Sequence, residues 1–257
     1  MSQPTPTATT PPGQPRLGVV VPLANEEATV RDFLRRVLAQ LDAGDRVFCI
    51  LDNASRDDTR ARVEGMAEED ARLVPVWAPE DRCVVDAYFR GYREALDAGC
   101  RWILEMDGGM SHRPEEIPRF IEAMAGGVDF AAGSRFMRGG RYIGWSFRRL
   151  VSWGGTILAN LLLGTRMKDM TSGFECFNRR AMGYVLARGT RSRAHFFQTE
   201  IRCTLRRWNW VEVPITYSNP SARLGRAGIM DALRSLWALR GQVRAEADRP
   251  QPPGDAR

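Results

Sequence analysis

Residues 17–51 read LGVVVPLANEEATVRDFLRRVLAQLDAGDRVFCIL, and this stretch predicts one β-α-β unit. The β-branched run Leu17–Leu23 predicts a buried strand, and Arg46–Leu51 predicts a second one. Between them, Glu26–Leu41 places apolar side chains at the i, i+3, i+4 spacing of an amphipathic helix. A strand, a helix and a strand in this order are typical of a parallel sheet with crossover helices.

The same alternation continues along the chain and predicts an α/β fold. A mostly parallel central sheet with helices on both faces is expected, and such sheets bind ligands at the carboxyl ends of their strands. Residues 17–243 are expected to form one domain, because no repeat or linker divides them; the segments 1–16 and 244–257 are expected to be disordered tails. The further strands are expected at Leu73–Trp77, Arg101–Met106 and Val128–Gly133, and the helices at Asp57–Asp70, Val84–Ala98 and Pro114–Ala125.

The composition narrows the function classes. The formal charge is +6, and every basic residue except Lys168 is arginine, which suits phosphate capture but also reflects genome composition. Basic and acidic residues are interleaved and no nucleic-acid module is visible, so no nucleic-acid partner is expected. His112 and His195 are the only histidines, which disfavours a zinc site or a Ser-His-Asp triad. Five separated cysteines and a Pro/Thr-rich start predict buried free thiols and a cytoplasmic protein.

Polar residues follow three of the predicted strands. They occupy Pro22–Glu27, Asp52–Thr59 and Glu105–His112. Any one of these segments fits an ordinary turn or helix cap. Three acidic strand ends on one sheet edge gather negative charge around a single crevice. Carboxylates there can accept hydrogen bonds from the base and the ribose hydroxyls of a nucleotide sugar. They can also bind a divalent cation that faces its diphosphate.

These segments resemble the motifs of the family-two glycosyltransferases. VVVPLANEE (19–27) is similar to the family's VVIPTYNEE, and LDNASRDDT (51–59) to VDDGSTDGT. EMDGGMSHRPEEIP (105–118) is similar to EMDADLSHDPEEIP, which is typical of dolichol-phosphate mannose synthases and other polyprenyl-phosphate glycosyltransferases. Residues 133–164, 168–182 and 196–217 match later family segments. The resemblance extends from Leu17 to about Arg240.

The resemblance implies a GT-A fold and an inverting transfer reaction. A mannose- or glucose-type sugar would move from a nucleotide-diphosphate donor, of the GDP-mannose or UDP-glucose type, to a polyprenyl or dolichyl phosphate at the membrane surface. Such an acceptor is already anionic, so no general base has to remove a proton from it. The donor would be bound by Pro22, Asn25, Glu26, Asp52 and Asp107.

The resemblance also assigns catalytic, phosphate-binding and metal residues. The catalytic residues would be Asp107, Arg135, Arg149 and Asp169. The acceptor and phosphate groups would be bound by Arg135, Arg148, Arg149, Thr171, Ser172, Gly173 and Arg223, with Arg226 nearby. Mg²⁺ or Mn²⁺ would be bound by Asp107 and Ser111.

Three departures from the family pattern bear on activity. Gly109 stands where the family has the second aspartate of DxD, Asn53 replaces an aspartate, and Cys83–Val85 replaces a G-x-G. An active enzyme with a weak or atypical metal requirement explains these losses. A weakened paralogue that binds a nucleotide sugar without transferring it explains them as well. The intact acceptor-side motifs favour the active enzyme.

The apolar segment Leu150–Gly164 has 15 residues, fewer than the roughly 20 that cross a bilayer. It could be an ordinary core helix. Flanking cations (Arg148, Arg149, Arg166 and Lys168) favour a helix that lies in the headgroup region instead. Ile229–Leu239 is similarly amphipathic. Peripheral attachment to the cytoplasmic face of the membrane is therefore expected.

Overall fold

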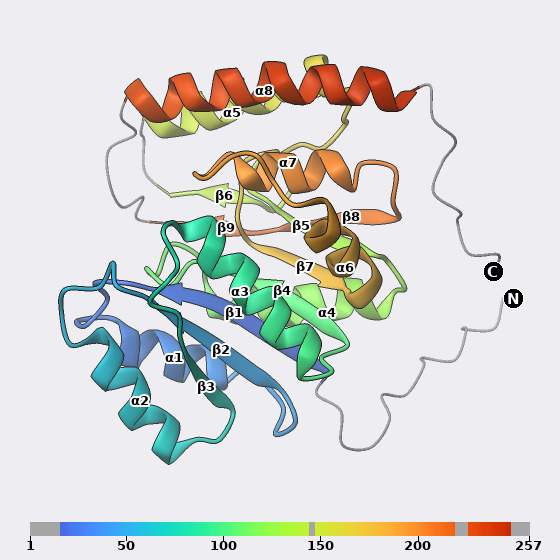
Figure 1. The fold of residues 1–257 in the computed structure, drawn as a ribbon. Helices are drawn as coiled ribbons and strands as arrows, with labels where there is room; N and C mark the ends of the chain where they lie inside the picture. Colours follow the sequence, from blue (N-terminus) through green and yellow to red (C-terminus); the bar gives the residue numbers. More distant parts are fainter. Residues whose placement is uncertain (1–15, 144–146, 219–225, 248–257) are drawn as a thin grey trace, which may run out of the picture.

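The computed structural model describes residues 16–143, 147–218 and 226–247 (Figure 1). Its centre is a seven-stranded sheet in the order β3-β2-β1-β4-β7-β5-β8. Strand β7 is antiparallel to both neighbours, and the other pairs are parallel. The predicted α/β fold with a mostly parallel sheet is confirmed. The strands are β1 (Leu17–Leu23), β2 (Arg46–Leu51), β3 (Leu73–Trp77), β4 (Trp102–Glu105), β5 (Phe130–Ser134), β7 (Glu175–Asn178) and β8 (Trp210–Pro214).

Helices cover both faces of this sheet. One face is covered by α1 (Val30–Leu38), α2 (Thr59–Glu69) and α4 (Ile117–Ala125), which follows a 3₁₀ turn at Pro114–Glu116. The other face is covered by α3 (Val84–Asp97), α6 (Arg179–Arg188) and α7 (Phe197–Thr204). Two long helices, α5 (Phe147–Leu163) and α8 (Arg226–Ala247), lie side by side beyond α7 (Figure 1). A small second sheet pairs β6 (Arg141–Tyr142) with β9 (Thr216–Tyr217).

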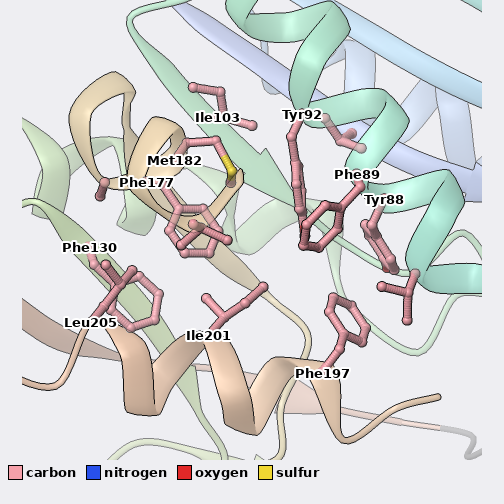
Figure 2. Close-up of a cluster of buried hydrophobic side chains, with 14 of the residues drawn as sticks. Tyr88, Phe89, Tyr92, Ile103, Phe130, Phe177, Met182, Phe197, Ile201 and Leu205 are labelled. Atoms are coloured by element: carbon pink, nitrogen blue, oxygen red, sulfur yellow. The ribbon is translucent and has the colours of Figure 1, made fainter. Parts of the chain in front are cut away.

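The strands are mostly apolar because helices cover both faces of the sheet. Successive side chains alternate, so Val20 packs on the α3 side, while Val19 and Val21 pack on the α1 side. Figure 2 shows the α3 side, where rings from α3, β5, β7 and α7 meet. Tyr88 and Phe197 lie 5.4 Å apart between ring centroids in this cluster. The packed strands hold their carboxyl ends, and the polar loops after them, in fixed positions.

Several element ends differ from the sequence expectations. Helix α1 begins at Val30 instead of Glu26, because the carbonyl of Glu26 accepts the N–H groups of Thr29 and Val30 in a turn before the helix. Helix α2 begins at Thr59, because the carboxylate of Asp57 accepts the Thr59 N–H. The expected strands at residues 101–106 and 128–133 are Trp102–Glu105 and Phe130–Ser134.

The boundaries of the two expected tails also differ from the sequence expectations. Arg16 forms ion pairs with Asp42 and Asp45, and α8 continues to Ala247, four residues past the expected end of the domain at 243. Residues 1–15 and 248–257 lie outside the described part. All five cysteines are free thiols, as expected, but Cys83 is only half-buried. Within the described residues, no helix has both the length and the apolar content of a transmembrane span.

Two helical glycines test the packing of α3 on the sheet. A Cβ at Gly91 in α3 would lie 2.2 Å from Cγ1 of Val20, whereas a Cβ at Gly65 in α2 would meet nothing within 4 Å. We expect Gly91→Ala to lower the free energy of unfolding by about 1–3 kcal/mol through overpacking. The matched change Gly65→Ala should raise it by roughly 0.5–1 kcal/mol. Urea unfolding of both variants measures the difference, and equal effects would contradict this account of α3 packing.

Candidate active site

A cavity of about 1040 Å³ opens at the carboxyl ends of β1, β2 and β4 and reaches α5 and α8. It brings together residues that the sequence places far apart. Nine of the expected site residues line it: Pro22, Glu26, Asp52, Asp107, Ser111, Arg135, Thr171, Ser172 and Gly173. The sequence therefore identified both a strand-end side and a second side formed by residues 171–173.

Asp107 is held by two contacts just after β4. Its Oδ1 accepts a hydrogen bond from the Tyr88 hydroxyl at 2.9 Å, and its backbone N–H donates to Nδ1 of His112 at 3.2 Å. Burial lowers the pKa of His112, and an Nδ1 that accepts a hydrogen bond belongs to a neutral ring. The Asp107 carboxylate itself is 42% exposed. The loop thus presents a fixed, accessible carboxylate to the cavity.

Asn25 differs from its expected role as a donor-binding residue. Its side chain donates to the carbonyl of Ala54 at 3.2 Å and accepts the N–H of Arg56 at 2.9 Å. Its backbone N–H donates to Oγ of Ser55. Asn25 is not among the described residues that line the cavity. It joins the loop after β1 to the loop after β2, and so positions its neighbours instead of facing a ligand.

Arg135 and Asp169 form a buried pair at the second side of the cavity. Nε and Nη2 of Arg135 donate to the two carboxylate oxygens of Asp169 at 2.7 and 2.9 Å, and Nη2 also donates to Thr171. Burial alone would raise the pKa of Asp169, but the charge and hydrogen bonds of Arg135 outweigh burial and hold it well below its ordinary value. Asp169 is fully buried and does not line the cavity. The expected catalytic Asp169 therefore orients Arg135 from behind.

Sequence reasoning missed Arg202, which is fully buried on α7. Its guanidinium pairs with Glu175 and donates to the carbonyl of Asp169. It also donates to the carbonyls of Ser172, at 2.9 Å, and Gly133, at 3.1 Å. Arg202 thus fastens the segment from Asp169 to Gly173 against β5. Arg202 lies in a helix whose residues from Phe197 to Cys203 are all buried, which the sequence pattern does not show.

The glycine of this segment leaves room for the side chain of Gln198. A Cβ at Gly173 would lie 1.7 Å from Nε2 of Gln198, which comes from α7 and also lines the cavity. A side chain at this position would require Gln198 to turn away from the segment.

The buried charges need one proton to be balanced. Glu105 and Asp107 face the same side of β4, as strand alternation predicts, and Glu105 hydrogen-bonds the Tyr92 hydroxyl. Burial raises the pKa of Glu105 well above its usual range, and nearby Glu175 and Asp107 raise it further. Burial raises the pKa of Glu175 as well, while its ion pair with Arg202 lowers it. Where Glu175 and Asp169 are ionised, Arg135 and Arg202 supply the matching positive charges. A protonated Glu105 makes the cluster neutral.

The remaining expected residues do not belong to the described lining. Arg149 is exposed in the first turn of α5. The side chain of Arg148 and the whole of Arg223 lie outside the described residues. Within the described part, no group of three or more His, Cys, Asp or Glu side chains could hold a metal ion. A cation in this cavity would therefore depend on one or two carboxylates together with ligand oxygens and water.

Comparison with known proteins gives a consistent family match. Residues 18–185 match the family described as Glycosyl transferase family 2. A polyprenol monophosphomannose synthase of Mycolicibacterium smegmatis is 30% identical over 203 residues, which cover 76% of this chain and 77% of that protein. An undecaprenyl-phosphate mannosyltransferase of Micrococcus luteus is 28% identical over 79% of this chain and 83% of its own.

Solved structures share the fold. Glucosyl-3-phosphoglycerate synthase from Mycobacterium tuberculosis, in complex with UDP, superposes with a TM-score of 0.65 at 18% identity. The superposition covers 89% of this chain and 81% of that one. The same enzyme has been solved with Mg²⁺ and UDP. The expected GT-A fold is confirmed by this likeness.

The raised pKa of Glu105 predicts a measurable pH dependence of stability. Folding holds a proton that the unfolded chain releases above the ordinary value of 4.5, so this contribution to stability is complete at low pH and is lost as pH rises toward the folded-state pKa. Glu105→Gln carries no such proton. As pH rises from 5 to 8, we therefore expect the free energy of unfolding of Glu105→Gln to increase relative to that of the wild type, by up to about 1.4 kcal/mol per pH unit.

Urea unfolding at several pH values measures this gain. Glu115→Gln is a suitable control, because its hydrogen bond to Arg36 lowers the pKa of Glu115 and moves its pH effect below pH 5. Parallel curves for Glu105→Gln and the wild type would show that Glu105 is ionised in the folded protein.

Proposed function

The chain belongs to Glycosyl transferase family 2, and on that premise we propose that it moves a sugar from a nucleotide-diphosphate donor to a polyprenyl phosphate, with inversion at the anomeric carbon. One observation carries this proposal. A single cavity runs from strand-end carboxylates to two helices whose outer faces are apolar. A sugar nucleotide fits the first end, and a lipid phosphate fits the second.

The strand-end side suits the donor. Pro22, Glu26, Asp52 and Asp107 line it, and carboxylates accept hydrogen bonds from ribose, base and sugar groups. Asp107 and Ser111 would hold Mg²⁺ or Mn²⁺, which when bound neutralises the diphosphate as it leaves. Both GDP-mannose and UDP-glucose satisfy this chemistry.

The second side suits a phosphate acceptor. Arg135 lines it, fixed by Asp169, and the segment Thr171–Gly173 is fastened by Arg202. An acceptor phosphate oxygen forms the new bond to the anomeric carbon as the carbon–oxygen bond to the nucleotide diphosphate breaks. No proton moves, so the residues need only orient the two phosphates and balance their charge. Arg148, Arg149 and Arg223 are proposed to add positive charge at the acceptor phosphate.

The outer faces of α5 and α8 support membrane attachment. Leu150, Trp153, Ile157 and Leu161 are 40–76% exposed and repeat along one side of α5. On α8, Met230, Leu233 and Trp237 form a similar stripe. Exposed tryptophans favour the headgroup region, and Arg166 and Lys168 are exposed just after α5. Leu233 belongs to both this face and the cavity lining, so a lipid acceptor could reach the site directly from the bilayer.

Asp107→Asn tests the proposed reaction. We expect transfer from GDP-mannose or UDP-glucose to a short polyprenyl phosphate to fall at least about 100-fold, because one preorganised electrostatic contact in an active site contributes this much. Glu122→Gln, an exposed change on α4, is the control and should keep full activity. Lipid-linked sugar is the measured product. An unimpaired Asp107→Asn enzyme would overturn the site, and a donor that binds without any product would favour the weakened paralogue.

Removing two tryptophans tests membrane attachment. We expect Trp153→Ser with Trp237→Ser to weaken co-sedimentation with anionic vesicles by at least about tenfold, since each ring loses its apolar burial. Binding of the wild type should also weaken with salt, because charges are screened over about 10 Å at 0.1 M. The control is Trp77→Ser, which changes an exposed tryptophan on β3. Equal wild-type sedimentation with and without vesicles would exclude attachment through this face.

A further inference from the structure

The loop after β4 has no side chain at Gly109, and a carboxylate from another loop fills that space. A Cβ built at Gly109 would lie 3.0 Å from Oε1 of Glu26 and 3.8 Å from its Cδ. Apart from Gly109 itself and its two chain neighbours, no other atom of the described residues lies within 4 Å of that point. Glu26 thus places its carboxyl group where an aspartate at position 109 would begin.

We propose that Glu26 supplies the second carboxylate of the metal site, in place of a side chain at Gly109. Together with Asp107 it would bind a divalent cation that faces the diphosphate of the donor. This inference rests on the proposed function, because the diphosphate completes the coordination shell. Ser111 remains a neutral ligand in this arrangement, and Glu26 brings the negative charge.

The side chain of Glu26 is anchored so that one oxygen points to Gly109. Its Oε2 accepts a hydrogen bond from Oγ1 of Thr29 at 2.6 Å, and its backbone N–H donates to Oγ1 of Thr59 at 2.8 Å. Thr59 is fully buried, which fixes the loop to the start of α2. Oε1 is then the oxygen left for a ligand.

Both loops are bent sharply next to this contact. Asn25 precedes Glu26 and Met110 follows Gly109, and both adopt φ near 59°. This left-handed conformation is unusual and strained for a residue other than glycine. The hydrogen bonds of Asn25 offset part of that cost. The strain is located where the two loops must bring Glu26 and Gly109 together.

The charge balance of the contact favours a cation. Glu26 and Asp107 both line the cavity, and no described arginine or lysine forms an ion pair with either of them. The loops are close, since a Cβ at Gly108 would lie 3.0 Å from the carbonyl oxygen of Pro22. Hard divalent cations prefer carboxylate oxygens, and Mg²⁺ commonly uses one or two carboxylates plus substrate phosphates. Glu26 and Asp107 can supply these two carboxylates.

Binding of Mn²⁺ to the full chain tests the proposal without any measurement of activity. Paramagnetic resonance of free Mn²⁺ gives the affinity in the presence of GDP, and separately of UDP. We expect Glu26→Gln to weaken Mn²⁺ binding at least about tenfold, since even indirect partners of metal ligands contribute 10–100-fold. The matched control is Glu27→Gln, which removes a neighbouring carboxylate that pairs with Arg62 outside the cavity and should change the affinity less than about twofold.

A carboxylate swap makes the test specific. In the double variant Glu26→Ala with Gly109→Asp, the carboxylate returns to the other loop, and we expect most of the Mn²⁺ affinity to return. Thermal unfolding confirms that each variant is folded. Unchanged affinity in Glu26→Gln, or no recovery in a folded double variant, would overturn the role proposed for Glu26. Neither result would contradict the proposed function. Absence of Mn²⁺ binding to the wild type with either nucleotide would overturn the metal site of the proposed function as well.

Discussion

Charge neutrality inside the protein is the constraint on which the site depends. Arg202 and Arg135 are buried with Asp169, Glu175 and Glu105, and buried charges persist only when they are paired and hydrogen-bonded. Arg202 meets this requirement by donating to carbonyls of the segment after Asp169, so its pairing also fixes that segment. The side of the cavity formed by residues 171–173 therefore takes its shape from the buried ion pairs behind it.

The same constraint connects the two sides of the cavity. Glu105 lies in the buried cluster, and Asp107, two residues further along the chain, faces the cavity on the same side of the sheet. Tyr92 and Tyr88 on α3 each hydrogen-bond one of these carboxyl groups. Helix α3 thus contacts one buried carboxyl group and one accessible carboxyl group.

Sequence patterns predicted what depends on local periodicity. Apolar runs located the strands, and Asp52 and Asp107 at their ends line the cavity as expected. The predicted ligand-binding roles were wrong where a polar side chain binds another part of the protein instead of lining the cavity. Asn25 and Asp169 stand in motif positions, yet Asn25 bridges two loops and Asp169 holds Arg135. Arg202 was missed because its partners come from β5, β7 and the segment before β7, and nothing adjacent in the sequence marks them.

The contact between Glu26 and Gly109 shows why a motif lost from one loop does not settle whether a site is lost. From the sequence alone, Gly109 removes a carboxylate, and only the intact acceptor-side motifs favour an active enzyme over a weakened paralogue. In the fold, the carboxyl ends of β1 and β4 are adjacent because these strands pair in parallel, so either loop can place an oxygen at the same point. The chemistry of a crevice at a sheet edge depends on which atoms line it. Loops that follow neighbouring parallel strands can place such atoms at the same position. Loss and gain of a ligand must therefore be judged across paired strands, and Glu26 places a carboxylate oxygen beside Gly109, where the loop after β4 has none.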